Sequence, residues 1–187
     1  MFRLFVGIPL PNSYQERMMS LTGDLALRLK SRINWTKPGN AHVTLKFLGP
    51  VDHTRIDAIA DVLSTIDFPP FYIRAGGCSC FPDENNPRVL WAGIMKGATA
   101  CTELAKNIET TLEPLGFKRD RGPFKSHMTL GRIKRLASDN WLEILRKTSG
   151  VWPGFLADRF VLWKSDLTPD GPIYSVVKEF ALQSEGK

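Results

Sequence analysis

Hydrophobic and polar residues alternate along several segments of the chain, which predicts β-strands with one buried face. These segments are residues 2–8, 41–48, 71–75, 88–95, 124–133, 155–164 and 172–182. Elsewhere, apolar residues recur every three or four positions, which predicts amphipathic helices. The helical segments are residues 12–31, 54–66, 98–115 and 138–148. The pattern predicts a mixed α+β protein with a turn-rich connection at 33–40 and an irregular segment at 76–87.

The order of these elements repeats along the chain. A strand, a helix and a strand that carries His-x-Thr-Leu are followed by a helix and a strand, and this series occurs twice. From Phe2 to His42 is 40 positions (42 minus 2), and from Arg88 to His127 is 39 (127 minus 88). The repeat predicts two similar lobes with a boundary near residues 76–87. Because each half is short for a core of its own, we expect residues 1–187 to form a single domain.

Charge and cysteine content narrow the function only slightly. The 25 Lys and Arg residues exceed the 19 Asp and Glu residues, which gives a formal net charge of +6. This excess suits a phosphate-bearing partner, but a solvated surface explains it equally well. An odd number of cysteines and an N-terminus without an export signal indicate a reducing, cytoplasmic setting. No apolar run approaches the roughly 20 residues that a membrane-spanning helix needs.

The two His-x-Thr-Leu segments are the strongest candidates for chemistry. Residues i and i+2 of a strand share a face, so His42 and Thr44 project together, as do His127 and Thr129. Histidine exchanges protons near neutral pH, and a threonine hydroxyl can hold a phosphoryl oxygen. One such motif would be structural by default. Because two of only three histidines lie in identical contexts, we favour a functional pair, and we expect His53, which has no counterpart, to lie on the surface.

These motifs, together with several flanking segments, resemble the 2H phosphoesterases. Within that superfamily the match is to the RNA 2′,3′-cyclic phosphodiesterases, historically called 2′-5′ RNA ligases. The matching segments are residues 3–8, 35–49, 88–93, 123–132 and 165–174. The resemblance implies a bilobal α+β fold in which two pseudo-symmetric lobes line a central cleft with antiparallel sheets and carry helices outside.

The resemblance also implies site residues and a substrate. It makes His42 and His127 catalytic, and it assigns phosphate binding to Thr44, Thr129 and Arg132, with Tyr174 as a possible substrate contact. The implied substrates are RNA ends or cyclic nucleotides. The implied reaction uses no metal and no cofactor, and neither a membrane nor an obligate protein partner is expected.

Arg132 poses a geometric problem. It lies five positions after His127, so an ideal strand would direct it to the opposite face. It can share the face of His127 only if the strand twists, bulges or ends there. Its counterpart in the repeat is Phe47, so the two lobes are not chemically equivalent.

Opening a cyclic phosphate requires a base for the attacking water and an acid for the departing ribose oxygen. It also requires groups that stabilise charge on the nonbridging oxygens. The family resemblance implies that the 3′-oxygen departs and a 2′-phosphate forms, and we assign His42 as the acid that protonates this oxygen and His127 as the base that activates water. Two alternatives remain open: ligation of RNA through a 2′-5′ bond by the reverse chemistry, and a nucleotide-binding or RNA-binding module without catalysis.

Other candidate residues carry less weight. Several basic residues flank the two motif strands, and they either bind RNA phosphates or are ordinary surface charges. These are Lys46, Arg119, Arg121, Lys125, Lys134 and Arg135. Trp35 and Trp91 are interpreted as packing residues, although an aromatic side chain at the mouth of the cleft can stack on a base. The Cys78-x-Cys80 pair lacks the partners of a zinc site and is interpreted as packing thiols.

Overall fold

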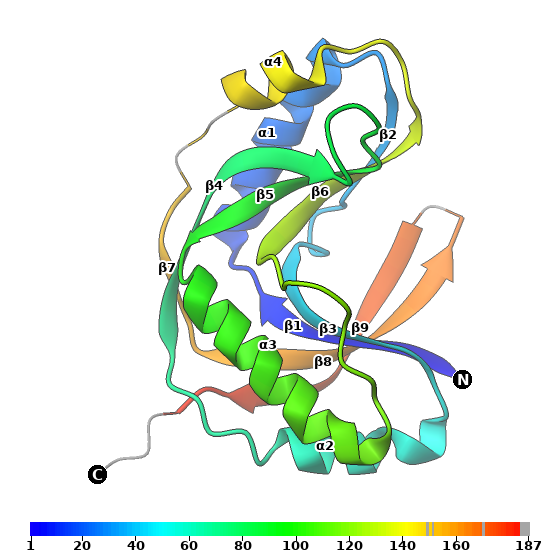
Figure 1. Ribbon diagram of the computed structural model, residues 1–187, viewed down its shortest axis with the longest axis vertical. Coiled ribbons are helices and arrows are strands. Elements are labelled where there is room, and N and C mark those ends of the chain that lie inside the picture. The colour runs from blue at the N-terminus through cyan, green and yellow to red at the C-terminus, as the bar shows by residue number, and fades with distance from the viewer. Residues whose placement is uncertain (149, 151, 170, 184–187) are drawn as a thin grey trace.

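The protein folds around one curled antiparallel sheet that carries helices along its outer side (Figure 1). The structure is a computed structural model that describes residues 1–148, 150, 152–169 and 171–183. The strands are β1 (Phe2–Pro9), β2 (Arg32–Trp35), β3 (His42–Val51), β4 (Phe71–Phe81), β5 (Val89–Lys96), β6 (His127–Arg135), β7 (Phe155–Ala157), β8 (Arg159–Thr168) and β9 (Gly171–Ala181). The helices are α1 (Asn12–Arg28), α2 (Ile56–Leu63), α3 (Ala98–Leu112) and α4 (Trp141–Lys147).

The sheet consists of two halves that meet at one point. The strand order is β7-β4-β5-β6-β3-β1-β8-β9, and β2 pairs with β6. Strands β3 and β6 join the halves through a single paired position, Val43 with Met128, and both side chains are fully buried. The expected α+β fold with antiparallel sheets and outer helices is confirmed, and the two sheets are continuous through this one pair.

Buried apolar stripes hold the helices against the sheet. Helix α3 lies in the segment predicted as an amphipathic helix at 98–115, and its apolar stripe of Cys101, Leu104, Ile108 and Leu112 is fully buried. Helix α3 packs on β3, while α1 reaches the other half of the sheet, where the Ala75 N–H donates a 2.9 Å hydrogen bond to the buried Tyr14 hydroxyl. None of the described helices is both long and apolar enough to cross a membrane.

Three local expectations are wrong, each because distant strand pairing overrides a local signal. The turn formers at 76–81 predict an irregular segment, but β4 continues to Phe81 because it pairs with β5 around a register shift at Gly76 and Cys78. Part of the expected connection at 33–40 pairs with β6 as β2. The strand expected at 155–164 is two strands, because β7 pairs with β4 whereas β8 pairs with β1.

Each half of the sheet takes strands from both parts of the sequence. Strands β1 and β3 pair, directly or through one another, with β8 and β9 from the C-terminal part. The other half combines β2 with β4 to β7. The internal repeat and the lobe boundary near 76–87 stay predictions, and in space the two sequence halves are interleaved.

Candidate active site on two matched histidine strands

Strands β3 and β6 present their first residues in the same way. Each strand begins at its histidine, at His42 in β3 and at His127 in β6. Over the first six residues of both strands, the histidine and threonine are half-buried, the residues after them are buried, and the sixth residue is exposed. The histidine and threonine of each motif therefore lie on one sheet face, here called the site face, while the intervening residues enter the core.

Each motif strand has a β-bulge, and in both strands the bulged residue is the leucine of the His-x-Thr-Leu motif. In β3, Gly7 of β1 pairs with Thr44 and Val6 pairs with Lys46, so Leu45 has no partner in this ladder. In β6, the register with β5 likewise passes from Thr129 to Gly131 and omits Leu130. An extra residue in one strand shifts the alternation of faces by one position.

The bulges turn the fifth residue after each histidine back to the site face. Arg132 therefore lies on the face of His127, which meets the condition stated from the sequence. Burial is the main effect on the pKa values of His127 and Tyr174; the Arg132 charge adds to the lowering at His127 and opposes the rise at Tyr174. The matching residue, Phe47, is 62% exposed, and its ring centroid lies 6.1 Å from that of Phe5.

Backbone carbonyls fix the orientation of both imidazole rings. The Nδ1 of His42 lies 2.8 Å from the carbonyl oxygen of Asn40, and the Nδ1 of His127 lies 2.7 Å from that of Lys125. Since a carbonyl can only accept, each Nδ1 carries the proton and donates. In the neutral ring, Nε2 then carries the lone pair that can take up a proton.

The two motif threonines take part in different hydrogen bonds. The Thr44 hydroxyl lies 2.9 Å from Nε2 of His42 and donates to it when the ring is neutral. The backbone carbonyl of Thr129 accepts a 2.8 Å hydrogen bond from the Thr36 side chain, which joins β6 to the end of β2. The supporting carbonyls of Asn40 and Lys125 escape sequence reasoning, although both lie two positions before a histidine.

Aromatic rings enclose both histidines. Around His42, ring centroids lie at 4.7 Å for Phe5, 5.5 Å for Trp163 and 5.3 Å for Tyr174. The predicted contact residue Tyr174 thus lies beside His42, brought there by β9. Around His127, the ring centroids of Phe81 and Trp91 lie at 5.0 and 5.7 Å. These contacts exclude water from much of each imidazole.

This enclosure shifts the proton equilibria of the site. Burial lowers the pKa of His42 to about 4, against a smaller opposing effect of the Asn40 hydrogen bond, and the nearby His127 lowers it further. Burial also lowers the pKa of His127, and the Arg132 charge adds to this effect. Burial raises the pKa of Tyr174, so its phenol stays protonated at neutral pH. Without a bound anion, both histidines are therefore mainly neutral at pH 7.

Lys46 lies outside the site and is 3% exposed, so both interpretations considered for it, an RNA-phosphate contact and an ordinary surface charge, are wrong. Its side chain is buried, and its ammonium contacts the Glu109 carboxylate at 2.6 Å, the Asp120 carboxylate at 2.8 Å and the Lys118 carbonyl at 2.8 Å. These partners use all three ammonium hydrogens. Lys46 is therefore unavailable for RNA phosphates and instead ties β3 to α3 and to the loop that leads to β6.

Replacing Lys46 with methionine should lower the free energy of unfolding at pH 7 by about 2 kcal/mol, because three acceptors lose their donor. Burial alone would raise the pKa of Glu109, but the hydrogen bonds from Lys46 and the Asp120 N–H bring it below its usual value. A carboxylate with a lowered pKa stabilises the fold above its unfolded pKa and loses this contribution as pH falls. The difference in free energy of unfolding between wild type and Lys46→Met, measured by urea unfolding, should therefore become smaller below about pH 4. The exposed Lys106, also on α3, provides the control variant Lys106→Met, and an equal loss in both variants would contradict the prediction.

Of the other sequence candidates, Trp91 lies beside His127, whereas His53, Arg119 and the cysteines make no contact with either histidine ring. His53 is exposed, with 73% of its side chain accessible, and it lies 3.4 Å from Asp52. Arg119 pairs with Glu113 at 2.9 Å. Cys78 and Cys80 are free thiols. Within the described part of the chain, no three His, Cys, Asp or Glu residues gather closely enough to hold a metal ion.

The fold and the matched histidine strands place the protein in the class of two-histidine phosphoesterases. A family model described as LigT like Phosphoesterase matches residues 8–91 and 95–174, and the chain belongs to this family. A relative from Archaeoglobus fulgidus named RNA 2′,3′-cyclic phosphodiesterase is 37% identical over 95% of this chain and 99% of its own length. A relative of the same name from Methanocaldococcus jannaschii is 33% identical over 95% of this chain and 99% of its own.

Solved structures agree with this assignment at the level of the fold. A crystal structure of a protein from Thermus thermophilus has a TM-score of 0.83 at 26% identity, covering 98% of this chain and 100% of that one. The structure of Escherichia coli LigT complexed with 3′-AMP has a TM-score of 0.77 at 22% identity, covering 98% and 99%. The family resemblance inferred from the motifs is confirmed.

Proposed function

We propose that the protein hydrolyses 2′,3′-cyclic phosphates at RNA ends or on nucleotides to 2′-phosphomonoesters. The observation that carries this proposal is the matched pair of imidazoles, His42 and His127, each with its Nδ1–H held by a backbone carbonyl, which makes Nε2 the nitrogen that can exchange a proton. The name shared by the curated relatives supports the same substrate class.

The two histidines divide the proton transfers. The guanidinium of Arg132 beside His127 favours the neutral imidazole, which suits a base that takes a proton from the attacking water. His42 then protonates the departing 3′-oxygen. Since its pKa is about 4 in the free protein, His42 needs the negative charge of the bound phosphate to hold its proton. In-line attack thus proceeds with the base and the acid on opposite sides of phosphorus.

Neighbouring groups bind the rest of the substrate. The hydroxyls of Thr44 and Thr129 and the guanidinium of Arg132 donate to the nonbridging oxygens, where charge accumulates in the transition state. The protonated phenol of Tyr174 is a further donor beside His42. The exposed ring of Phe47 provides a stacking surface for the base of the reacting nucleotide.

The test is hydrolysis of 2′,3′-cyclic AMP in the presence of EDTA, with chromatographic separation of 2′-AMP from 3′-AMP. We expect turnover to continue in the chelator and 2′-AMP to accumulate. No turnover, or a reaction that the chelator abolishes, would overturn the proposal.

The pH dependence of kcat/KM follows from the lowered pKa values, because this parameter reports the free enzyme. The productive form carries one proton on the pair, and the pKa is about 4 for His42 and below its usual value for His127. We therefore expect kcat/KM for 2′,3′-cyclic AMP to peak on the acid side of pH 6.5 and to fall about tenfold per unit above it, as the last imidazolium is lost. Rates from pH 4 to 9 test this, and a level profile from pH 6.5 to 9 would contradict it.

We also infer a reducing, cytoplasmic location. Cys78, Cys80 and Cys101 are all free thiols. Burial raises the pKa of Cys101 to about 12, which keeps it protonated and unreactive.

A further inference from the structure

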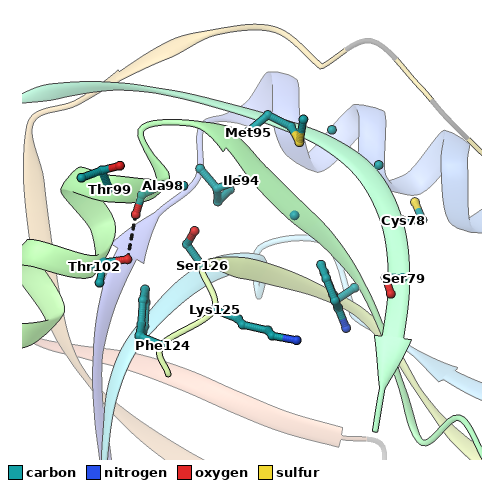
Figure 2. Close-up of a pocket in the computed structure, with 14 residues that line it drawn as sticks. Cys78, Ser79, Ile94, Met95, Ala98, Thr99, Thr102, Phe124, Lys125 and Ser126 are labelled. Carbon is teal, nitrogen blue, oxygen red and sulfur yellow. Dashed lines mark hydrogen bonds between the residues drawn. The ribbon is translucent and has the colours of Figure 1, made fainter. Parts of the chain in front are cut away.

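A hollow of about 640 Å³ adjoins the His127 side of the site. Its walls come from β4, β5, the first turn of α3 and the segment that enters β6. Figure 2 shows Thr99 and Thr102 on the helix side, Cys78 and Ser79 across from them, and Lys125 and Ser126 between. We propose that this hollow is a second nucleoside-binding subsite, next to the reacting nucleotide. The inference rests on the proposed cyclic phosphodiesterase function.

The hollow is continuous with the candidate active site. Residues 124–126 line it and lead directly into His127. Trp91 also lines it, pairs in register with Thr129, and has its ring centroid 5.7 Å from that of His127. A ligand in the hollow would therefore contact residues 124–126 and Trp91, which also border the site of the reacting phosphate at His127.

The lining suits a flat base. Gly76, Gly77 and Gly93 contribute backbone without side chains, and a Cβ added at Gly93 would lie 3.3 Å from the Trp91 ring. The Trp91 ring fills the space at Gly93 and the Met95 side chain fills that at Gly76, whereas nothing lies within 4 Å of a Cβ built at Gly77, so the open space lies there. Phe81 stacks on Trp91 at 4.9 Å and holds this ring as a stacking wall. The hydroxyls of Ser79, Thr99 and Ser126 can hydrogen-bond to the edge of a base.

The charge at the hollow suits a phosphate between two nucleosides. The ammonium of Lys125 lies 5.8 Å from the Phe81 ring centroid, and the same ring meets the edge of His127 at 5.0 Å. Lys125 thus places a cation at the hollow, and the Phe81 ring contacts both this cation and His127. None of the described residues that line the hollow is acidic. A nucleoside joined through a phosphodiester would place its charge at Lys125.

The size of the hollow distinguishes this role from storage of the attacking water. One water molecule occupies about 30 Å³, far less than the hollow provides. In the proposed function, the base of the reacting nucleotide stacks on the exposed Phe47 ring, which lies on the other half of the sheet. The additional space thus corresponds to a second nucleoside.

Two sources can supply that nucleoside. One is the nucleotide that precedes the cyclic end in the same RNA. The other is a separate nucleoside whose 5′-hydroxyl replaces water: its oxygen bonds to phosphorus, its proton passes to His127, the bond to O3′ breaks, and O3′ takes a proton from His42. The second source yields a 2′-5′ phosphodiester.

Filling the hollow from α3 tests the proposal. Thr102 is exposed and lines the hollow, and Asn107 is exposed on the same helix but does not line it. The variants are Thr102→Trp and the control Asn107→Trp, with Thr99→Trp as a second filling variant in case the first does not fold. The substrates are 2′,3′-cyclic AMP and the dinucleotide ApA with a 2′,3′-cyclic end.

For the same-strand source, we expect the wild type to prefer the dinucleotide by at least ~10-fold in kcat/KM, the scale of one stacked base. Thr102→Trp should remove this preference and leave hydrolysis of 2′,3′-cyclic AMP unchanged, while Asn107→Trp should keep both. For the separate source, adenosine added to 2′,3′-cyclic AMP should give 2′-5′ ApA with the wild type and none with Thr102→Trp.

Four results are possible. If Thr102→Trp removes either the dinucleotide preference or the formation of 2′-5′ ApA, the second subsite is supported, and the affected reaction identifies where its nucleoside comes from. The proposal of a second subsite is overturned if wild type and Thr102→Trp prefer the dinucleotide equally and neither gives 2′-5′ ApA. It is also overturned if Thr102→Trp loses equal activity on both substrates, because the hollow would then hold the base of the reacting nucleotide itself. If the wild type does not hydrolyse 2′,3′-cyclic AMP at all, the proposed function fails instead.

Discussion

Replacing either His42 or His127 with alanine is expected to lower turnover of 2′,3′-cyclic AMP at least ~10²-fold, the scale of losing a general acid or base. Each imidazole performs one proton transfer in the same displacement, so neither compensates for the other. The measurement is kcat under saturating substrate at pH 6, with folding checked by circular dichroism.

The third histidine provides a matched control. His53 is exposed and lies before α2, so His53→Ala should keep wild-type kcat. The double variant His42→Ala/His127→Ala should lose little more than either single variant, because groups that act as a unit are not additive. A His42→Ala enzyme with near-normal kcat would contradict the two-histidine mechanism.

Replacing Arg132 with methionine is expected to lower kcat/KM by about 10²- to 10³-fold, as for loss of a preorganised donor to the transition state. The bulge at Leu130 directs this guanidinium to the site face, where its charge also lowers the pKa of His127. Without that charge, the pKa of His127 should rise. The kcat/KM profile of the variant should therefore shift toward higher pH, a change that a merely unstable variant would not show.

Arg135, near the end of the same strand, is the control for general electrostatic attraction. It is exposed and pairs in register with Arg32 of β2 rather than with the site. Arg135→Met should retain most of the activity and an unshifted pH profile. Equal losses in the two variants would show that the net charge matters and that the position of Arg132 does not.

The sequence predicted those parts of the fold that depend on local patterns. The buried stripe of α3 and the two His-x-Thr faces follow from periodicity alone, and the structure shows both. Strand β2 was missed because Pro38 and Gly39 give its neighbourhood the character of a turn. Only its partner, β6, makes Arg32–Trp35 a strand.

The details of the site depend on contacts between distant segments. The matched bulges at Leu45 and Leu130 arise from pairing with β1 and β5, which no local signal encodes. The same holds for Lys46, whose acceptors on α3 and the following loop lie more than 60 positions away. The sequence shows only a basic side chain next to a motif, which is compatible with phosphate binding, and does not show that distant acceptors occupy its ammonium group.

The interleaved strand order has a consequence for dividing the chain. A break in the loop between β4 and β5 would leave β1 and β3 on one fragment and their partners, β8 and β6, on the other. The same break would separate β4 from β5, and His42 from His127. Each fragment would then expose unpaired strand edges that only the other fragment fits. The two pieces are expected to be inactive apart and to reconstitute one enzyme when refolded together.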